Sequence, residues 1–122
     1  MGGVQNVARI RNAQFYCEPM PSGYTATIGC NNAALYIGGE GSESTRVFVN
    51  NCTFDAKTQP IVLRGSSGEK NNVLYISNSK LVSTKKIRID SNHKVYLGIG
   101  NNFDATAANN PSKVTVTNNK YL

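Results

Sequence analysis

In the stretch Val47-Phe48-Val49-Asn50-Asn51-Cys52-Thr53-Phe54, two apolar residues stand at alternate positions, asparagine follows, and another apolar residue comes three positions later. Alternation places Val47 and Val49 on the same side of a short strand. Asparagine tolerates left-handed backbone angles, so we expect Asn51 to turn the chain and Phe54 to lie in the next strand.

This pattern recurs through the chain, and its five copies centre on Asn12, Asn51, Asn78, Asn101 and Asn118. The copy at Asn101 is one residue shorter than the others. A second kind of strand lies between the copies and starts at Leu35, Ile61 and Ile87, which are 26 residues apart. Internal repetition on this scale is the signature of a solenoid.

The repeats predict an all-β parallel β-helix in which three short strands form each coil and equivalent strands stack in parallel. About four coils fit into the chain. Side chains that point inward should stack on their equivalents about 4.8 Å apart, and the asparagines should form a ladder of amide hydrogen bonds. The predicted inward residues are Leu35, Ile37, Val47, Val49, Ile61, Leu63, Leu74, Ile76, Ile87, Ile89, Leu97, Ile99, Val114 and Val116. An eight-stranded sandwich would use hairpin turns such as Asn-Gly, and the sequence contains no such dipeptide.

The order of strand, glycine-containing turn, strand, asparagine turn, strand and variable loop resembles the pectate-lyase-like right-handed β-helix superfamily. The resemblance covers residues 7–122 and rests on the asparagine-turn repeat. That superfamily includes polysaccharide lyases, hydrolases and many phage tailspikes. The resemblance therefore implies a right-handed parallel β-helix and, because tailspike-like β-helices are typically homotrimers, a homo-oligomer.

We expect one domain over residues 1–122 that is a piece of a larger protein, with residues 1–3 as an expression start. Two segments break the repeat. Residues 16–32 form an insertion in the first coil. In the resembling superfamily a loop at that corner builds a wall of the binding cleft, which places Tyr24 among the expected ligand residues. Residues 104–112 are polar and irregular, and we expect them near an end of the solenoid.

The chain is basic, with a formal net charge of +6 from 13 Lys and Arg against 7 Asp and Glu. Such a charge is compatible with a basic surface that only contacts solvent, or with a surface that binds an acidic polysaccharide. Nucleic acid is disfavoured as a partner, because the sequence has no basic helix, zinc-finger spacing or RNA-binding sheet motif. No apolar run reaches the roughly 18 residues of a membrane-spanning helix, and no signal-peptide core is present.

Three cysteines, Cys17, Cys30 and Cys52, form an odd number, which argues against a secreted disulfide scaffold. A bridge between Cys17 and Cys30 stays open. His93 is the only histidine, and no cysteine stands at metal-ligand spacing from it. We therefore expect neither a metal nor another cofactor.

The outward residues of the second kind of strand should form one exposed face made of Tyr36, Gly38, Val62, Arg64, Arg88 and Asp90. The resemblance implies that this sheet lines a substrate groove. Arg64 and Arg88 would pair with sugar carboxylates or phosphates through their planar guanidinium groups, and Tyr36 would stack on a sugar ring. The competing interpretation is a set of ordinary surface ion pairs, each worth about 0–1 kcal/mol.

Catalysis on this face is disfavoured. Glycoside hydrolysis uses two carboxyl groups about 5–9.5 Å apart, and Asp90 is the only acid that we expect there. Elimination from a uronate would need a calcium-binding acidic cluster, which the sequence does not offer. An enzyme would have to rely on Arg64, Arg88 and Asp90, and we assign no catalytic residue.

A second outward column should run through Arg9, Phe48, Tyr75, Tyr96 and Thr115. Exposed aromatic residues on neighbouring coils mark an interface or a ligand platform. Three interpretations stay open for this column. Sister chains of a trimer bury it, sugars stack on it, or a loop or neighbouring domain covers it.

The sequence thus predicts a structural, adhesive β-helix module of a phage tailspike-like or other cell-surface carbohydrate-directed protein. The module would bind a surface glycan, in the virion tail or outside the cell. One alternative is a polysaccharide lyase or glycoside hydrolase that acts on an acidic polysaccharide. The other is an assembly module without a ligand, which trimerises through Phe48, Tyr75 and Tyr96.

Overall fold

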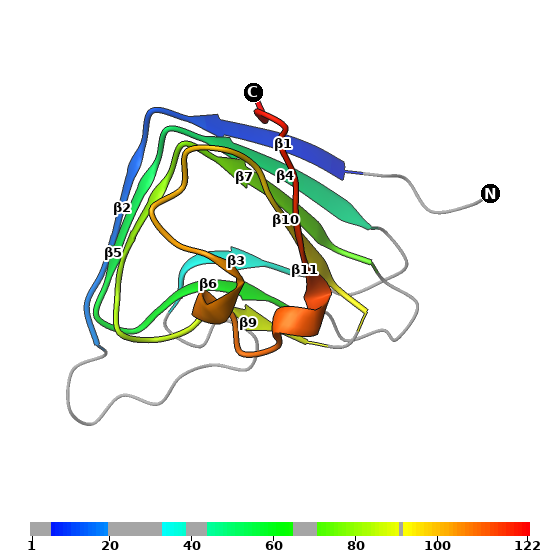
Figure 1. The fold of residues 1–122 in the computed structure, drawn as a ribbon. Coiled ribbons are helices and arrows are strands. Elements are labelled where there is room, and N and C mark those ends of the chain that lie inside the picture. Colours follow the sequence, from blue (N-terminus) through cyan, green and yellow to red (C-terminus); the bar gives the residue numbers. More distant parts are fainter. Residues whose placement is uncertain (1–5, 20–32, 39–43, 65–70, 91) are drawn as a thin grey trace.

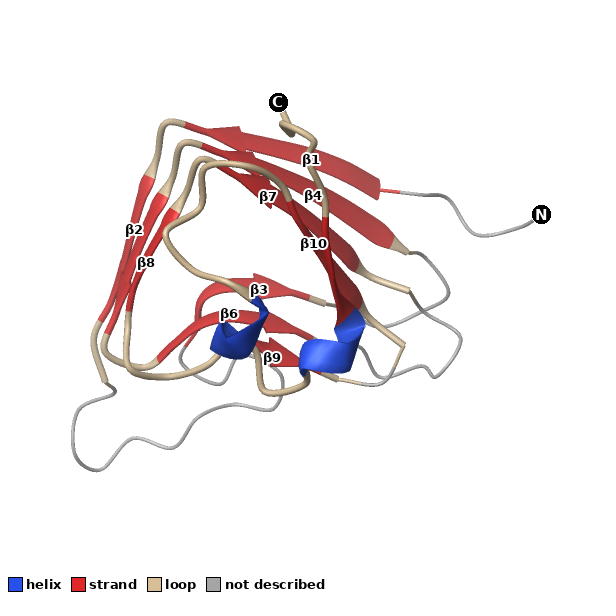
Figure 2. Ribbon diagram, in the orientation of Figure 1, coloured by secondary structure: helices blue, strands red, loops and turns tan. Residues whose placement is uncertain are grey.

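A computed structural model describes residues 6–19, 33–38, 44–64, 71–90 and 92–122. Eleven β-strands and two 3-10 helices lie in these residues, and none of them is in an α-helix (Figure 2). The strands are β1 (Asn6–Arg11), β2 (Gln14–Cys17), β3 (Ala33–Ile37), β4 (Thr45–Asn50), β5 (Thr53–Ala56), β6 (Gln59–Leu63), β7 (Val73–Ser77), β8 (Lys80–Val82), β9 (Arg88–Ile89), β10 (Lys94–Leu97) and β11 (Val114–Val116). The 3-10 helices are η1 (Ala105–Ala107) and η2 (Pro111–Lys113).

The strands form three sheets, and every pair of neighbouring strands runs parallel. Sheet A has the order β1-β4-β7-β10-β11, sheet B has β2-β5-β8, and sheet C has β3-β6-β9. The chain visits sheets A, B and C in turn, and Figure 1 shows them as three sides around a common interior. The predicted all-β architecture with parallel strands is confirmed, and it is compatible with a β-helix. The described strands contain no antiparallel pair of the kind that a sandwich needs.

Alternation explains which side chains enter the interior. Strand β4 buries Val47 and Val49 and leaves Phe48 half-buried on the opposite side of sheet A. Strand β7 pairs with it in register, so Leu74 lies beside Val47 and Ile76 beside Val49. Each such side chain contributes roughly 1.5–3 kcal/mol when it is fully buried.

The same stacking continues in the other sheets and produces one apolar core. Phe15 and Phe54, on neighbouring strands of sheet B, stack with ring centroids 4.8 Å apart and an angle of 8° between the planes. In sheet C, Leu35 pairs with Ile61, as the 26-residue spacing predicts. The core cluster comprises Ile37, Val47, Val49, Cys52, Phe54, Ile61, Leu63, Leu74, Ile76, Ile87, Ile89, Val95, Leu97 and Ala108.

We call each successive set of strands in sheets A, B and C a coil, and asparagines form the corner between sheets A and B in the first three coils. Asn12, Asn51 and Asn78 have left-handed backbone angles, with φ of 56°, 55° and 51°. Asn51 Nδ2 donates to Asn12 Oδ1 at 2.7 Å, which is one step of the expected ladder. At the next step Asn78 Nδ2 donates to Oδ1 of Asn50 at 2.9 Å, so Asn50 takes the place of Asn51 as the acceptor in the ladder.

The copy that we assigned to Leu97 and Ile99 lies two residues earlier than expected. Leu97 pairs with Ile76, so Val95 and Leu97 are the two inward residues of β10. Ile99 is 45% exposed and does not belong to the core. Three apolar residues alternate here, and the pair Leu97 and Ile99 matches the repeat pattern because Asn101 follows it, whereas the structure uses Val95 and Leu97.

The left-handed residue in that coil is Gly100, with φ of 84°, rather than Asn101. Only glycine fits there, because a Cβ on Gly100 would lie 2.0 Å from Asn78 Oδ1. Asn101 links coils through its side chain instead. It accepts from the backbone N–H of Ser79 at 3.0 Å and donates to the carbonyl of Ile76 at 3.0 Å.

The last copy of the repeat also departs from the expected form. Val114 is half-buried against the core, but Val116 is 66% exposed because β11 is a short strand at the edge of sheet A. Asn118 is not among the residues with positive φ in the described part of the chain. Tyr121, which the pattern placed at the start of a further inward strand, packs edge-on against Tyr75.

The two segments that break the repeat differ in how much the structure says of them. Strand β2 continues through Cys17, so the first two residues of the expected 16–32 insertion pair with β5. The rest of that insertion from residue 20 onward, including Tyr24 and Cys30, lies outside the described residues.

Residues 104–112 contain η1 and the start of η2, and they lie beside the last strand of sheet C. Ala108 forms a parallel bridge with Ile87, and the backbone N–H of Ile89 donates to Asn109 Oδ1 at 2.9 Å. These contacts satisfy strand groups of the Ile87–Ile89 edge that would otherwise be open.

Candidate functional site

Sheet C brings most of the predicted ligand residues onto one surface. Tyr36, Val62 and Arg88 occupy the same position on its three strands. Gly38, Arg64 and Asp90 follow two residues later, each directly after the last residue of its strand. The backbone N–H groups of Arg64 and Asp90 donate to the preceding strand at 2.9 and 3.1 Å, so this second row stays in register. Tyr24, the remaining predicted ligand residue, lies outside the described residues.

Asp90 holds the two arginines at the centre of this surface. Arg88 Nε donates to Asp90 Oδ1 at 3.0 Å, and Arg64 Nε lies 3.8 Å from Asp90 Oδ2. The three side chains are 34%, 35% and 26% exposed, for Arg88, Arg64 and Asp90 respectively. Counted over these three side chains, the formal charge is +1. Ion pairs this exposed add little stability, but they order the arginine side chains.

Tyr36 lies along the sheet because Gly38 has no side chain. A Cβ on Gly38 would lie 2.7 and 2.9 Å from ring atoms Cε1 and Cζ of Tyr36, and 2.2 Å from the carbonyl oxygen of Arg64. The tyrosine ring therefore covers the space above Gly38, next to the second row. An aromatic ring beside a few fixed polar groups is a combination that ligand-binding sites commonly use.

Val62 differs from expectation. The alternation placed it on an exposed face, yet the structure buries it completely. It stands between Tyr36 and Arg88 in the first row, and these longer side chains flank it on both neighbouring strands. The exposed surface is consequently narrower than predicted. It consists of Tyr36, Arg64, Arg88 and Asp90, which we call the sheet C cluster.

A buried polar pair, Asn72 and His93, makes hydrogen bonds to the backbone of the sheet C cluster. The sequence did not predict this pair. The backbone N–H of Asn72 donates to His93 Nδ1 at 2.9 Å, and both side chains are fully buried. Asn72 Nδ2 donates to the carbonyl of Arg64 at 3.4 Å, and His93 N–H donates to the carbonyl of Asp90 at 3.1 Å. Nδ1 of His93 acts as an acceptor, so it carries no proton. The sequence offers no signal for this pair beyond the position of Asn72 one coil after Thr45, whose N–H it accepts at 3.0 Å.

The outer face of sheet A carries the predicted aromatic column. Arg9, Phe48, Tyr75, Tyr96 and Thr115 stand in register across all five strands. The rings of Phe48 and Tyr75 are 4.6 Å apart at 8°, those of Tyr75 and Tyr96 are 5.0 Å apart at 9°, and Arg9 Cζ lies 4.4 Å from the Phe48 centroid. Because the ring faces cover one another, the column presents ring edges outward. It is a poor platform for stacking with a sugar ring.

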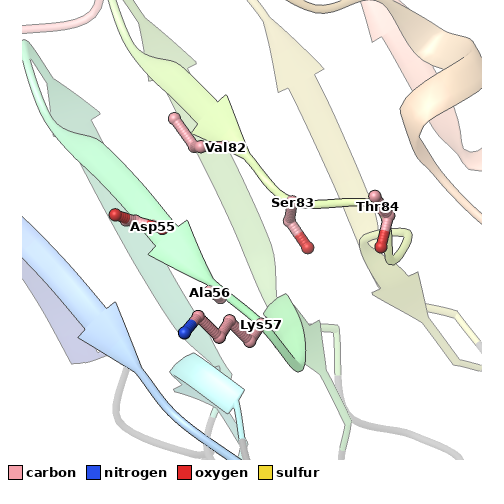
Figure 3. A pocket seen from close by; sticks show the side chains of 6 residues that line it. All are labelled: Asp55, Ala56, Lys57, Val82, Ser83 and Thr84. Atoms are coloured by element: carbon pink, nitrogen blue, oxygen red, sulfur yellow. The ribbon is translucent and has the colours of Figure 1, made fainter.

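Sheet B carries an open hollow of about 400 Å³ at the ends of β5 and β8 (Figure 3). Its lining residues are Asp55, Ala56, Lys57, Val82, Ser83 and Thr84. Lys57 Nζ lies 3.2 Å from Glu18 Oε1, and both side chains are largely exposed. Asp55 adds a second carboxylate beside the Lys57–Glu18 pair, so the hollow does not favour an acidic ligand.

The described residues contain no group of three or more His, Cys, Asp and Glu side chains able to hold a metal ion. Within the same residues, no helix has the length and apolar character needed to cross a membrane. No protein-family model, curated protein or solved structure matches the chain.

Proposed function

We propose that the chain is a right-handed parallel β-helix of the pectate-lyase-like kind, with a structural and adhesive role, that binds an acidic surface glycan at the sheet C cluster. The observation that supports this most is the Tyr36 ring over Gly38, next to two arginines ordered by Asp90. The ring offers an apolar surface to a sugar, and the arginines offer planar donors to its carboxylate.

Charge favours an acidic glycan over a neutral one. The side chains of the sheet C cluster have a formal charge of +1, and the whole chain has a formal charge of +6. Both attract a polyanion from a distance. By contrast, the hollow on sheet B has two carboxylates, Asp55 and Glu18, around the single ammonium of Lys57, and the rings of the aromatic column on sheet A stack on one another.

The biological setting that we propose follows from this role. A rigid stack of parallel strands with a glycan-binding side suits a phage tailspike-like or cell-surface protein, in the virion tail or outside the cell. Homotrimeric assembly belongs to the same proposal.

A glycan array tests the proposal. We expect the chain to bind acidic glycans and the double variant Arg64→Ala/Arg88→Ala to lose that binding. Loss of one charge-assisted hydrogen bond costs on the order of 1.5–3 kcal/mol, which is roughly tenfold or more in affinity. The matched control is Arg46→Ala/Lys80→Ala, which removes two positive charges from exposed positions of sheets A and B.

Equal loss in both double variants would mean that net charge alone drives binding, and unchanged binding in the Arg64 and Arg88 variant would remove the site. Circular dichroism of each variant shows whether the β-structure survives. Incubation with acidic polysaccharides adds a further arm. If reducing or unsaturated ends appear, the sheet C cluster belongs to a hydrolase or lyase instead.

A further inference from the structure

The two ends of the stack of coils differ in how their strand edges are covered. At the end with β8 and β9, asparagine side chains accept hydrogen bonds from the backbone of these strands. Asn102 Oδ1 accepts from the N–H of Leu81 at 2.9 Å, and Asn109 Oδ1 accepts from the N–H of Ile89 at 2.9 Å. Side chains of the chain itself therefore cover the edges of sheets B and C at this end.

The opposite end consists of β1, β2 and β3, which are the first strands of sheets A, B and C. In the described part of the chain, each of them has one neighbouring strand. The carbonyls of Ala13 and Cys17 each accept an N–H bond from the next coil at 3.0 Å. Successive residues of a strand direct their backbone groups to opposite sides, so those of Gln14 and Tyr16 point away from the next coil. We call the free edges of β1, β2 and β3 the open end.

The interior is less covered at the open end than one coil further along. Ile10 and Phe15 point inward from β1 and β2 and are partly buried. Their partners in the next coil, Val49 and Phe54, are fully buried. The difference arises because coils lie on both sides of Val49 and Phe54. A partner that covers the open end would bury apolar surface, which is the main favourable term in protein association.

The asparagine ladder indicates what kind of partner fits. Asn51 Nδ2 donates to Asn12 Oδ1 at 2.7 Å, and Asn78 Nδ2 donates to Asn50 Oδ1 at 2.9 Å, so each corner amide donates to the coil before it. Because Oδ1 of Asn12 faces Asn51, its Nδ2 faces the open end, and it donates to no described residue. A preceding coil with a side-chain carbonyl at the same corner would accept this hydrogen bond.

We infer that the open end is a docking surface for a β-helical coil of a partner protein, which adds one parallel strand to each of sheets A, B and C. The partner coil places apolar side chains over Ile10 and Phe15 and an asparagine over Asn12. Strand addition of this kind derives affinity from main-chain hydrogen bonds and specificity from alternate side chains.

A second copy of this chain fits the open end less well than such a coil. A copy related by a two-fold axis would run its strands antiparallel to β1, so the corner at Asn12 would not meet a second asparagine corner. A copy in the same orientation would have to dock through its opposite end. There the side chains of Asn102 and Asn109 already occupy the strand edges.

A synthetic peptide with the sequence of residues 45–64 serves as the test coil, because it carries one strand for each sheet and the corner asparagines. It is added to the ¹⁵N-labelled full chain under reducing conditions, and the shifts and hydrogen exchange of the backbone amides are measured. We expect the amides of Arg9, Gln14 and Tyr16 to exchange freely in the chain alone and to become protected with the peptide. A peptide with alanine in place of both corner asparagines should bind roughly fivefold more weakly.

Proline at position 16 tests the strand edge itself. Tyr16→Pro removes an N–H that points to the open end, and an edge strand tolerates proline where the N–H faces away from its sheet. We expect this variant to bind the peptide roughly tenfold more weakly. The matched control Tyr16→Ala keeps the N–H and should bind as the unaltered chain does. If Tyr16→Pro does not fold, Gln14→Pro and Gln14→Ala provide the same comparison.

Three outcomes overturn the inference. The first is protection of the Arg9, Gln14 and Tyr16 amides in the chain alone at a single-chain mass, because the chain itself would then cover the open end. The second is protection that appears together with a doubled mass in sedimentation, which would make the occupant a second copy. The third is a folded chain whose edge amides do not respond to the peptide. None of these measurements involves a glycan, so they do not depend on the proposed function.

Discussion

Three asparagines bend the chain between sheets A and B because their backbone adopts angles that most residues with a Cβ avoid. Asn12, Asn51 and Asn78 hold φ between 51° and 56°, and their short amide side chains also reach a neighbouring coil. Left-handed angles cost other L residues about 1–2 kcal/mol each. In the coil after Asn78 the same bend is made by Gly100.

Substitutions at Asn51 separate the backbone effect from the amide hydrogen bond. Asn51→Ala should lower the free energy of unfolding by roughly 1–2 kcal/mol. Asn51→Gly keeps the left-handed angle and loses only an exposed hydrogen bond to Asn12, so it should cost clearly less. Asn118→Ala is the control, because that exposed residue has no left-handed angle. Denaturant unfolding measures all three, and equal losses for the alanine and glycine variants of Asn51 would contradict this explanation.

Asp104 offers a prediction about pH. The side-chain hydroxyl and then the backbone N–H of Thr106 donate to its carboxylate at the start of η1, and these bonds lower the pKa of Asp104. A lowered pKa in the folded state means that the carboxylate stabilises the fold above its usual pKa. That contribution disappears as the pH falls through the lowered value.

An NMR titration of the Asp104 carboxyl in the unaltered chain and in Thr106→Val measures this effect. The pKa should rise toward its usual value in Thr106→Val, because the hydroxyl donor is gone. Thr106→Ser keeps the hydroxyl and should leave the lowered pKa in place. Identical titrations of the valine and serine variants would show that the hydroxyl has no role.

At the scale of elements, side chains that stack on neighbouring strands of one sheet join each coil to the next. Phe15 and Phe54 in sheet B are the largest such pair in the interior, and Phe54 is fully buried. Phe54→Ala should therefore lower the free energy of unfolding by about 3–5 kcal/mol. Tyr16→Ala on the exposed side of the same sheet, at 62% exposure, should change it by about 0.5 kcal/mol or less. Thermal unfolding of both variants checks the difference, and a small loss in Phe54→Ala would contradict the assigned interior.

The sequence predicts a strand correctly where only one pair of alternating apolar residues can point inward. In β4 and β7, two apolar residues stand at alternate positions and the turn asparagine follows two positions after the second of them, which fixes both the face and the turn. In β10 three apolar residues alternate, so the inward pair could be Val95 and Leu97 or Leu97 and Ile99. The choice between these two pairs depends on the close approach of residue 100 to the Asn78 side chain, which glycine allows because it has no Cβ. Such a contact between coils leaves no mark in a local pattern.

At the scale of the whole molecule, the candidate site could be located but not its internal contacts. The 26-residue spacing of Leu35, Ile61 and Ile87 is enough to bring Tyr36 and Arg88 onto one sheet. It does not reveal that Asp90 pairs with both arginines, because those pairs depend on side-chain conformations. The support from Asn72 and His93, and the position of Tyr121 on sheet A, arise from residues 21 to 44 positions apart. Separations of 21 and 44 residues differ from the 26-residue spacing of the repeat, so the repeat does not predict these contacts.

A ligand could bind to the outer face of sheet A, B or C, and one titration distinguishes these three places. In an ¹⁵N NMR titration with hexagalacturonate, an acidic sugar oligomer, we expect the largest shifts at Tyr36, Arg64, Arg88 and Asp90. Shifts confined to Tyr75 and Tyr96 on sheet A, or to residues that line the hollow on sheet B, would contradict the account. So would a folded spectrum that the oligomer and the acidic glycans selected on the array leave unchanged.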